Sequence, residues 1–96
     1  MRQNIIVRRR KPYTIGRDEG NDCVLRSPYV SRHHAKIAWI KGQAYVNDQS
    51  TNGTYLNGSL VPKDAYIPVK DGDVISINKN YLADKYVLLV QIPKED

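Results

Sequence analysis

Closely spaced turn signals, with no helical periodicity between them, most constrain the fold of this 96-residue chain. Ser50–Gly58 contains two Asn-Gly dipeptides, and Lys41-Gly42 and Asp71-Gly72 are further tight-turn sequences. Each Asn-Gly pair is expected to reverse the chain tightly, because both residues tolerate positive φ. The segments between the turns are short and rich in Val, Ile, Leu and Tyr, which favour strands. The pattern predicts an all-β domain, and a β-sandwich in particular.

Short apolar runs between the turns give the expected strands. Ala35–Ile40 alternates, with Ala35, Ile37 and Trp39 on one face, which is typical of a half-buried strand. Tyr86–Ile92 shows no alternation and is expected to be a central strand that is covered on both faces. The other expected strands are Asn4–Val7, Tyr13–Ile15, Cys23–Leu25, Gln43–Asp48, Leu60–Val61, Tyr66–Val69 and Val74–Ile77.

Length and composition are those of an ordinary globular domain. With 41% hydrophobic and 26% charged residues, residues 1–96 are expected to form a single domain with its own core. No apolar run approaches the roughly 18 residues of a membrane helix, and no signal-peptide pattern is evident, so a cytoplasmic location is expected. The single cysteine, Cys23, excludes an internal disulfide and a cysteine-cluster metal site. Neither a metal nor a cofactor is expected.

The net charge of +5 comes largely from one basic run, Arg8–Lys11. Outside this run, the chain has eleven basic and ten acidic residues. The run is most simply a solvated strand end or loop, because no recognition helix and no pattern of stacking aromatic residues accompanies it. The alternative is a basic module that binds nucleic acid or anionic lipid through Arg8–Lys11, and this affinity would fall steeply with salt.

Three separated loops carry polar residues that a sandwich could bring together at one end. They contain Gly16-Arg17, Ser31–His34 and Ser50–Gly58. In this order and spacing, and with Asp48 two residues before Ser50, these motifs resemble the signature of forkhead-associated (FHA) domains. The resemblance runs from about Tyr13 to the final strand, which is nearly the whole chain.

The resemblance implies a SMAD/FHA-type β-sandwich of about eleven strands, with ligand-binding loops at one end and no catalytic activity. It implies a signalling module that binds a protein or peptide phosphorylated on threonine by a Ser/Thr kinase. It leaves the oligomeric state open. The residues implied to bind the phosphopeptide are Arg17, Ser31, Arg32, Thr51 and Asn52. The residues implied to brace the loops are Gly16, His34, Gly53, Asn57 and Gly58.

The chemistry of these residue types suits a phosphorylated ligand. A phosphothreonine carries about −1.5 to −2 charges and three strong acceptor oxygens at neutral pH. A guanidinium group can donate to two of those oxygens at once. Tyr29 and Val30 precede Ser31 in the loop with which this family usually reads the third residue after the phosphothreonine. We therefore expect them to favour an aliphatic or aromatic residue there.

Two further interpretations are open on sequence alone. His33-His34 beside Ser31 suggests a hydrolase, but no Gly-x-Ser-x-Gly elbow and no orienting carboxylate can be assigned. The two histidines should point to opposite faces of an extended chain, so they cannot easily share a metal. The other interpretation is a scaffold domain of this fold that no longer binds phosphate. The intact Arg17, Ser31, Thr51 and Asn52 argue against it.

Overall fold

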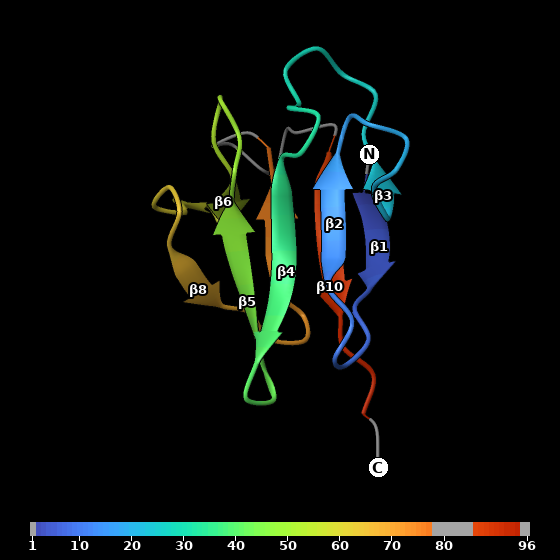
Figure 1. Cartoon of the computed structure of the whole chain (residues 1–96), viewed down its shortest axis with the longest axis vertical. Helices are drawn as coiled ribbons and strands as arrows, with labels where there is room; N and C mark the ends of the chain where they lie inside the picture. Colours follow the sequence, from blue (N-terminus) through green and yellow to red (C-terminus); the bar gives the residue numbers. More distant parts are fainter. Residues whose placement is uncertain (1, 78–85, 95–96) are drawn as a thin grey trace.

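Residues 2–77 and 86–94 are described by the computed structural model, and they form two packed β-sheets (Figure 1). The strands are β1 (Arg2–Ile6), β2 (Tyr13–Gly16), β3 (Cys23–Val24), β4 (Ala35–Ile40), β5 (Gln43–Asp48), β6 (Tyr55–Leu56), β7 (Ser59–Leu60), β8 (Tyr66–Pro68), β9 (Val74–Ser76) and β10 (Val87–Gln91). One sheet has the order β1-β10-β9-β6-β7, and the other has the order β3-β2-β4-β5-β8. In the described residues no helix is long and apolar enough to cross a membrane.

The all-β sandwich expected from the sequence is confirmed. Strands β4 and β5 have the expected bounds, and the others differ from expectation by one or two residues at their ends. Strand β6 was not expected, because it lies within the polar segment Ser50–Gly58. The described residues contain ten strands, where the resemblance implied about eleven.

The hydrophobic core lies between the two sheets. Ile37 and Val46 line it from one sheet, and Ile75 and Leu88 line it from the other; all four are fully buried. Burying each such side chain contributes roughly 1.5–3 kcal/mol before entropy is counted. Trp39 shares the inward face of β4, as its alternation predicts, but it is only partly buried at the edge of this core.

The last strand, β10, lies inside its sheet. It pairs in parallel with β1 along one edge and antiparallel with β9 along the other. Val87 and Leu88 are successive residues that point to opposite faces, and both are buried. The expectation of a central strand covered on both faces is therefore confirmed at this end of β10.

The two Asn-Gly pairs have different roles. Asn57 and Gly58 have φ angles of 50° and 85°, and they form the two-residue hairpin turn between β6 and β7. Gly53 has a φ of 107°, but Asn52 is not in the positive-φ region. This pair belongs to the connection from β5 to β6, which lie in different sheets. Asn52-Gly53 is therefore not a hairpin turn between paired strands, and it shapes a loop between the two sheets.

The strand directions divide the loops between two ends of the sandwich (Figure 1). Loops 17–22, 25–34 and 49–54 lie together at the upper end in the figure, and we call them the rim. Loops 7–12 and 41–42 lie at the lower end, which we call the basic pole. The three motif-bearing loops therefore meet on one side of the molecule, and the basic run lies on the other.

Candidate functional site

Arg17 joins the first rim loop to the second. It follows Gly16, the last residue of β2, and its backbone N–H donates to the carbonyl of Ser31 at 2.9 Å. Its side-chain Nε donates to the carbonyl of Val30 at 3.0 Å. The two terminal guanidinium nitrogens donate no hydrogen bond to any described residue. Because the stem is held and the residue is exposed, these nitrogens can donate to an anion.

Ser31 and Thr51 join the second rim loop to the third. The backbone N–H of Thr51 donates to Ser31 Oγ at 3.0 Å, so the serine hydroxyl keeps its own hydrogen as a donor. The side chains of Thr51 and Arg32 are exposed and make no hydrogen bond within the described part of the chain. The structure thus brings the expected phosphate-binding residues to one rim.

Asn52 and Tyr29 form a second contact between these loops. Asn52 Nδ2 donates to the carbonyl of Tyr29 at 2.9 Å. The Tyr29 side chain is 73% exposed, so it can contact a bound peptide, as expected of a specificity residue. Val30 is only 1% exposed and packs in the core. The expectation that Val30 contacts a peptide is therefore wrong; its carbonyl holds Arg17 instead.

His34 is fully buried beneath the rim. Its Nδ1 accepts from the backbone N–H of Ser31 at 3.1 Å, so the ring proton lies on Nε2 and is donated to the carbonyl of Gly53 at 2.9 Å. Burial lowers the pKa of this imidazole, although the Gly53 carbonyl and the charge of Asp48 act against the shift. Both ring nitrogens are engaged by the backbone, so His34 cannot act as a base towards Ser31 Oγ. This removes the basis of the hydrolase interpretation.

Gly16 is required by a close backbone approach. A Cβ atom at this position would lie 2.1 Å from the carbonyl oxygen of Arg32. That oxygen also accepts from the side-chain amide of Asn21 at 2.8 Å. A glycine therefore lets the first two rim loops touch through their backbones. The sequence assigned no role to Asn21, which also donates to the carbonyl of Asp18 at 2.8 Å.

Among the described residues, the hydrogen bonds of Asn57 go to the start of β9 and not to the rim loops. The backbone N–H of Asn57 donates to Val74 at 2.7 Å, and Asn57 Oδ1 accepts from the backbone N–H of Val74 at 2.8 Å. These two bonds fix the β6–β7 hairpin against the start of β9. The bracing expected of this pair thus acts on the sheet below the rim.

Asp48 organises the third rim loop, although the sequence assigned it no separate role. Its carboxylate is buried, and Oδ1 accepts from Ser50 N at 3.1 Å, Ser50 Oγ at 2.6 Å and Thr54 Oγ1 at 2.6 Å. Ser50 Oγ in turn accepts from the backbone N–H of Gly53 at 2.8 Å. The signal was the Asp-x-Ser spacing, since aspartate commonly accepts from the backbone two residues later.

A hollow beside Arg17 is large enough for a phosphate group. It has a volume of about 330 Å³ and is lined by Arg17, Asp18, Glu19, Arg32 and His33. The carboxylate of Glu19 is paired with Arg26 at 3.2 Å, an exposed ion pair that contributes little to stability. The two arginines of the lining make no ion pair with a described residue.

Taken together, the fold and the rim define a class of protein: a β-sandwich recognition domain whose loops at one end present exposed cations and hydroxyl groups over a hydrogen-bonded base. The family model for the FHA domain matches residues 13–78. This match covers more than half of the chain, and the chain belongs to the FHA domain family.

Curated relatives and solved structures agree with this assignment. FhaB, an FHA domain-containing protein of Mycobacterium tuberculosis, is 36% identical over 72% of this chain and 44% of its own length. The ABC transporter ATP-binding/permease protein Rv1747 of the same organism is 42% identical over 66% of this chain and 7% of its own length. The chain thus spans less than half the length of either relative.

Two solved structures hold phosphothreonine peptides. The N-terminal FHA domain of Saccharomyces cerevisiae Rad53 in such a complex has a TM-score of 0.69 and 34% identity, over 77% of this chain and 61% of that chain. The MEK1 FHA domain with a HOP1 phosphothreonine peptide has a TM-score of 0.64 and 32% identity, over 70% of this chain and 72% of that chain.

Proposed function

We propose that this domain is a signalling module that binds proteins phosphorylated on threonine by a Ser/Thr kinase. The phosphate is held at the rim by Arg17, Ser31, Arg32 and Thr51, and Asn52 holds the peptide backbone. The FHA domain is a non-catalytic binding module, and this domain has the same role. A cytoplasmic location, expected from the sequence, is part of the proposal.

The position of Arg17 is the observation that carries this proposal. Its Nε is bonded to Val30, while its terminal nitrogens remain available beside the hollow at the rim. The side chain thus gives up little conformational freedom when it binds an anion. The Ser31 hydroxyl is fixed by Thr51 in the same way, so two phosphate donors are oriented before the ligand arrives.

A preference for phosphothreonine over phosphoserine depends on how rigid the rim is. Burying the additional methyl group contributes only about 0.8 kcal/mol, which is roughly a fourfold difference in affinity. Stronger discrimination requires loops that fix the position of this methyl group. The hydrogen bonds that Asp48 accepts from Ser50 and Thr54, together with His34 below them, supply that rigidity.

The solved relatives support the proposal because they pair the same fold with the proposed ligand. The Rad53 and MEK1 domains are each solved with a phosphothreonine peptide. The structure of the FhaA FHA domain with the intracellular domain of Rv3910 has 37% identity over 67% of this chain. We infer that the partner here is likewise a phosphorylated segment of another protein.

The proposal is tested with wild-type protein and the Arg17→Ala variant. Calorimetric titration with matched threonine, phosphothreonine and phosphoserine peptides measures the binding. The peptides come from a library, or from partners captured from lysate with and without phosphatase treatment. A charge-assisted hydrogen bond contributes roughly 1.5–3 kcal/mol, so Arg17→Ala should weaken phosphothreonine binding on the order of ten- to a hundredfold.

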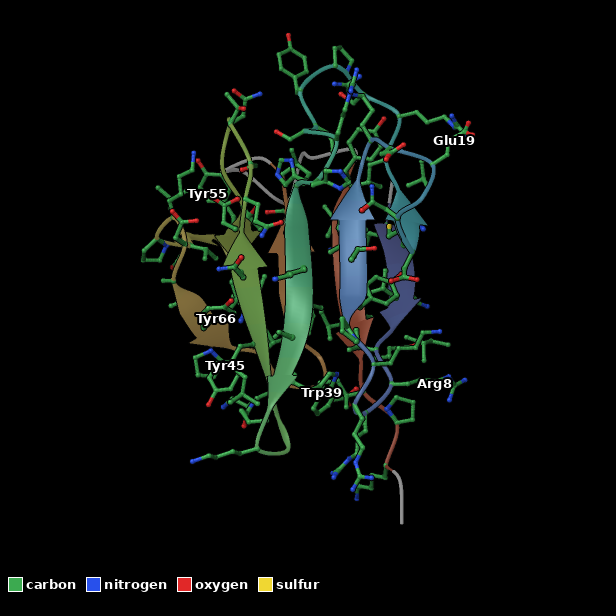
Figure 2. The ribbon with its side chains drawn as sticks, in the orientation of Figure 1. Arg8, Glu19, Trp39, Tyr45, Tyr55 and Tyr66 are labelled. Carbon is green, nitrogen blue, oxygen red and sulfur yellow. The ribbon has the colours of Figure 1, made fainter. Side chains whose placement is uncertain are left out.

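Arg8→Ala is the matched control. It removes the same charge from an exposed arginine at the opposite end of the sandwich (Figure 2). Its affinity should stay within about twofold of wild type, because salt screens an exposed charge that lies far from the rim. Equal losses in both variants, or equal binding of phosphorylated and unphosphorylated peptides, would count against the proposal.

A further inference from the structure

A second basic hollow lies at the basic pole. It has a volume of about 340 Å³ and is lined by Arg9, Arg10, Pro12, Trp39, Lys41 and Gly42. Figure 2 shows Trp39 and Arg8 towards this end of the molecule, with Glu19 of the rim at the other end. Three of the six lining residues are cations, and none is acidic. The hollow is therefore separate from the rim and strongly positive.

These cations form no ion pair with any residue that the structure describes. The single ion pair between described residues joins Arg26 to Glu19, and it lies at the rim. Arg9, Arg10 and Lys41 are exposed and donate no side-chain hydrogen bond to a described residue. Because like charges held close together repel one another, this arrangement is unfavourable until an anion binds.

Two of the cations also occupy backbone positions that disfavour them. Arg10 has a φ of 64° and Lys41 has a φ of 51°, and they are two of the four non-glycine residues with positive φ in the described chain. This conformation costs most residues roughly 1–2 kcal/mol, whereas glycine adopts it freely and asparagine tolerates it. A glycine or asparagine would be more stable at either turn position. Instead, each turn places a long cationic side chain in the lining of the same hollow.

Trp39 forms part of the wall of this hollow. Its indole Nε1 is covered from solvent, and no acceptor for it exists among the described residues. Because a covered N–H is out of reach of an anion in the hollow, the indole contributes an apolar wall, and the attraction for an anion comes from the three cations.

From these observations we propose that the hollow around Trp39 is a second anion-binding site, which takes a compact ligand with at least two phosphate groups. A single phosphate monoester carries only about −1.5 to −2 charges, which is less than the three cations can neutralise. Each of the two guanidinium groups can donate two hydrogen bonds to one phosphate, so the pair suits a ligand with neighbouring phosphates. The limited volume favours a small head group over a nucleic-acid duplex, whose phosphates are spread along its length.

Trp39 makes this site directly measurable, because it is the single tryptophan of the chain. Inositol hexakisphosphate is titrated at physiological ionic strength while tryptophan emission is followed. The expected result is a saturable change in emission, with inorganic phosphate binding much more weakly. A phosphothreonine peptide without aromatic residues should leave the emission unchanged. No emission change with inositol hexakisphosphate would overturn the proposal.

Two variants test the role of the cations. Arg10→Asn and Lys41→Asn each remove one charge and place a residue that tolerates the positive φ, so both should fold at least as stably as wild type. Each should weaken inositol hexakisphosphate binding roughly tenfold. Arg2→Asn removes the same charge from β1, outside the hollow, and should change the affinity little. Equal losses in Arg2→Asn would show that only net charge matters and would overturn the proposal.

Further experiments separate this site from the rim and identify the source of the ligand. Arg17→Ala should leave inositol hexakisphosphate binding intact, so a failure of phosphothreonine binding and a failure of this proposal are distinguishable. Vesicles of phosphatidylcholine with and without a phosphoinositide distinguish a lipid head group from a free ligand; binding to either source supports the site. Tighter binding of duplex DNA through Arg10 and Lys41 would replace the proposal with a nucleic-acid surface.

Discussion

At the scale of single residues, the buried His34 links the stability of the rim to pH. Neutral His34 accepts a hydrogen bond from Ser31 and donates one to Gly53, and protonation would remove the acceptor. Burial lowers its pKa below the ordinary value of 6.5, so the unfolded chain binds more protons than the folded one when the pH falls below 6.5. The stability due to neutral His34 is therefore complete above pH 6.5 and is lost as the pH falls through the folded pKa.

This prediction is checked by chemical denaturation of the peptide-free domain at a series of pH values below 6.5. The free energy of unfolding should decrease as the pH falls, and His34→Gln should flatten this dependence even though it lowers stability overall. His33→Gln, which alters the exposed neighbour, should keep the wild-type slope. A slope that disappears in His33→Gln and persists in His34→Gln would refute the assignment.

Gly16 gives a second prediction at this scale. In Gly16→Ala the new methyl group would lie 2.1 Å from the Arg32 carbonyl oxygen, so the second rim loop must move. We expect a loss of stability on the order of 1–3 kcal/mol together with weaker phosphopeptide binding. Thermal unfolding and calorimetry measure the two effects.

Gly20→Ala is the control for Gly16→Ala. The nearest atom to a Cβ at Gly20 is Asp18 Oδ2 at 3.9 Å, which is ordinary contact. This variant should behave like wild type in both measurements. If Gly16→Ala were equally harmless, the close approach of the two loops would not be a constraint on the rim.

At the scale of elements, a substitution in the β6–β7 hairpin should lower the stability of the domain without changing its affinity for a phosphopeptide. Asn57→Ala places a methyl side chain at a φ of 50° and removes the acceptor for Val74 N–H. We expect a loss of about 1–3 kcal/mol in unfolding free energy with unchanged phosphopeptide affinity, because the hydrogen bonds of Asn57 to described residues go to Asp73 and Val74 and not to the rim loops. Asn57→Gly retains the turn conformation and should lose less stability. Reduced peptide affinity in a stably folded Asn57→Gly variant would contradict this division.

How far the sequence predicts the elements depends on where the relevant contacts lie. The bounds of β4 and β5 follow from local signals, namely an alternating apolar pattern and the Lys41-Gly42 turn. The two-residue strand β6 could not be found in this way, because it exists only through pairing with β7 and β9. Asn52-Gly53 has the sequence of a hairpin turn, yet the change of sheet after β5 gives it another role.

The sequence predicts those site residues that belong to a recognisable loop motif. Arg17, Ser31 and Thr51 were expected and lie on loops that the structure brings together. The burial of Val30 was not predictable, since it depends on how its loop packs over the core. The same holds for the hydrogen bond from Asn21 to the Arg32 carbonyl, because a contact between loops leaves no local pattern.

At the scale of the whole molecule, the two ends of the sandwich should act independently. A ligand at about a hundred times its Kd stabilises the folded state by roughly 2.7 kcal/mol, which raises the Tm of a small domain on the order of 10 °C. We expect a phosphothreonine peptide and inositol hexakisphosphate each to raise the Tm, and their stabilisation free energies to add. Scanning calorimetry with each ligand and with both checks this. Clearly smaller combined stabilisation would mean that the ligands compete at one site.

The parallel pairing of β1 with β10 determines how this domain should be attached to a sensor surface. The chain enters β1 on the side of the rim and leaves β10 towards the basic pole (Figure 1). A biotin or fluorophore attached after β10 would leave the rim accessible and crowd the hollow at the basic pole. A label attached before β1 would crowd the rim and leave the hollow accessible. Each immobilisation geometry therefore presents one face of the domain and shields the other.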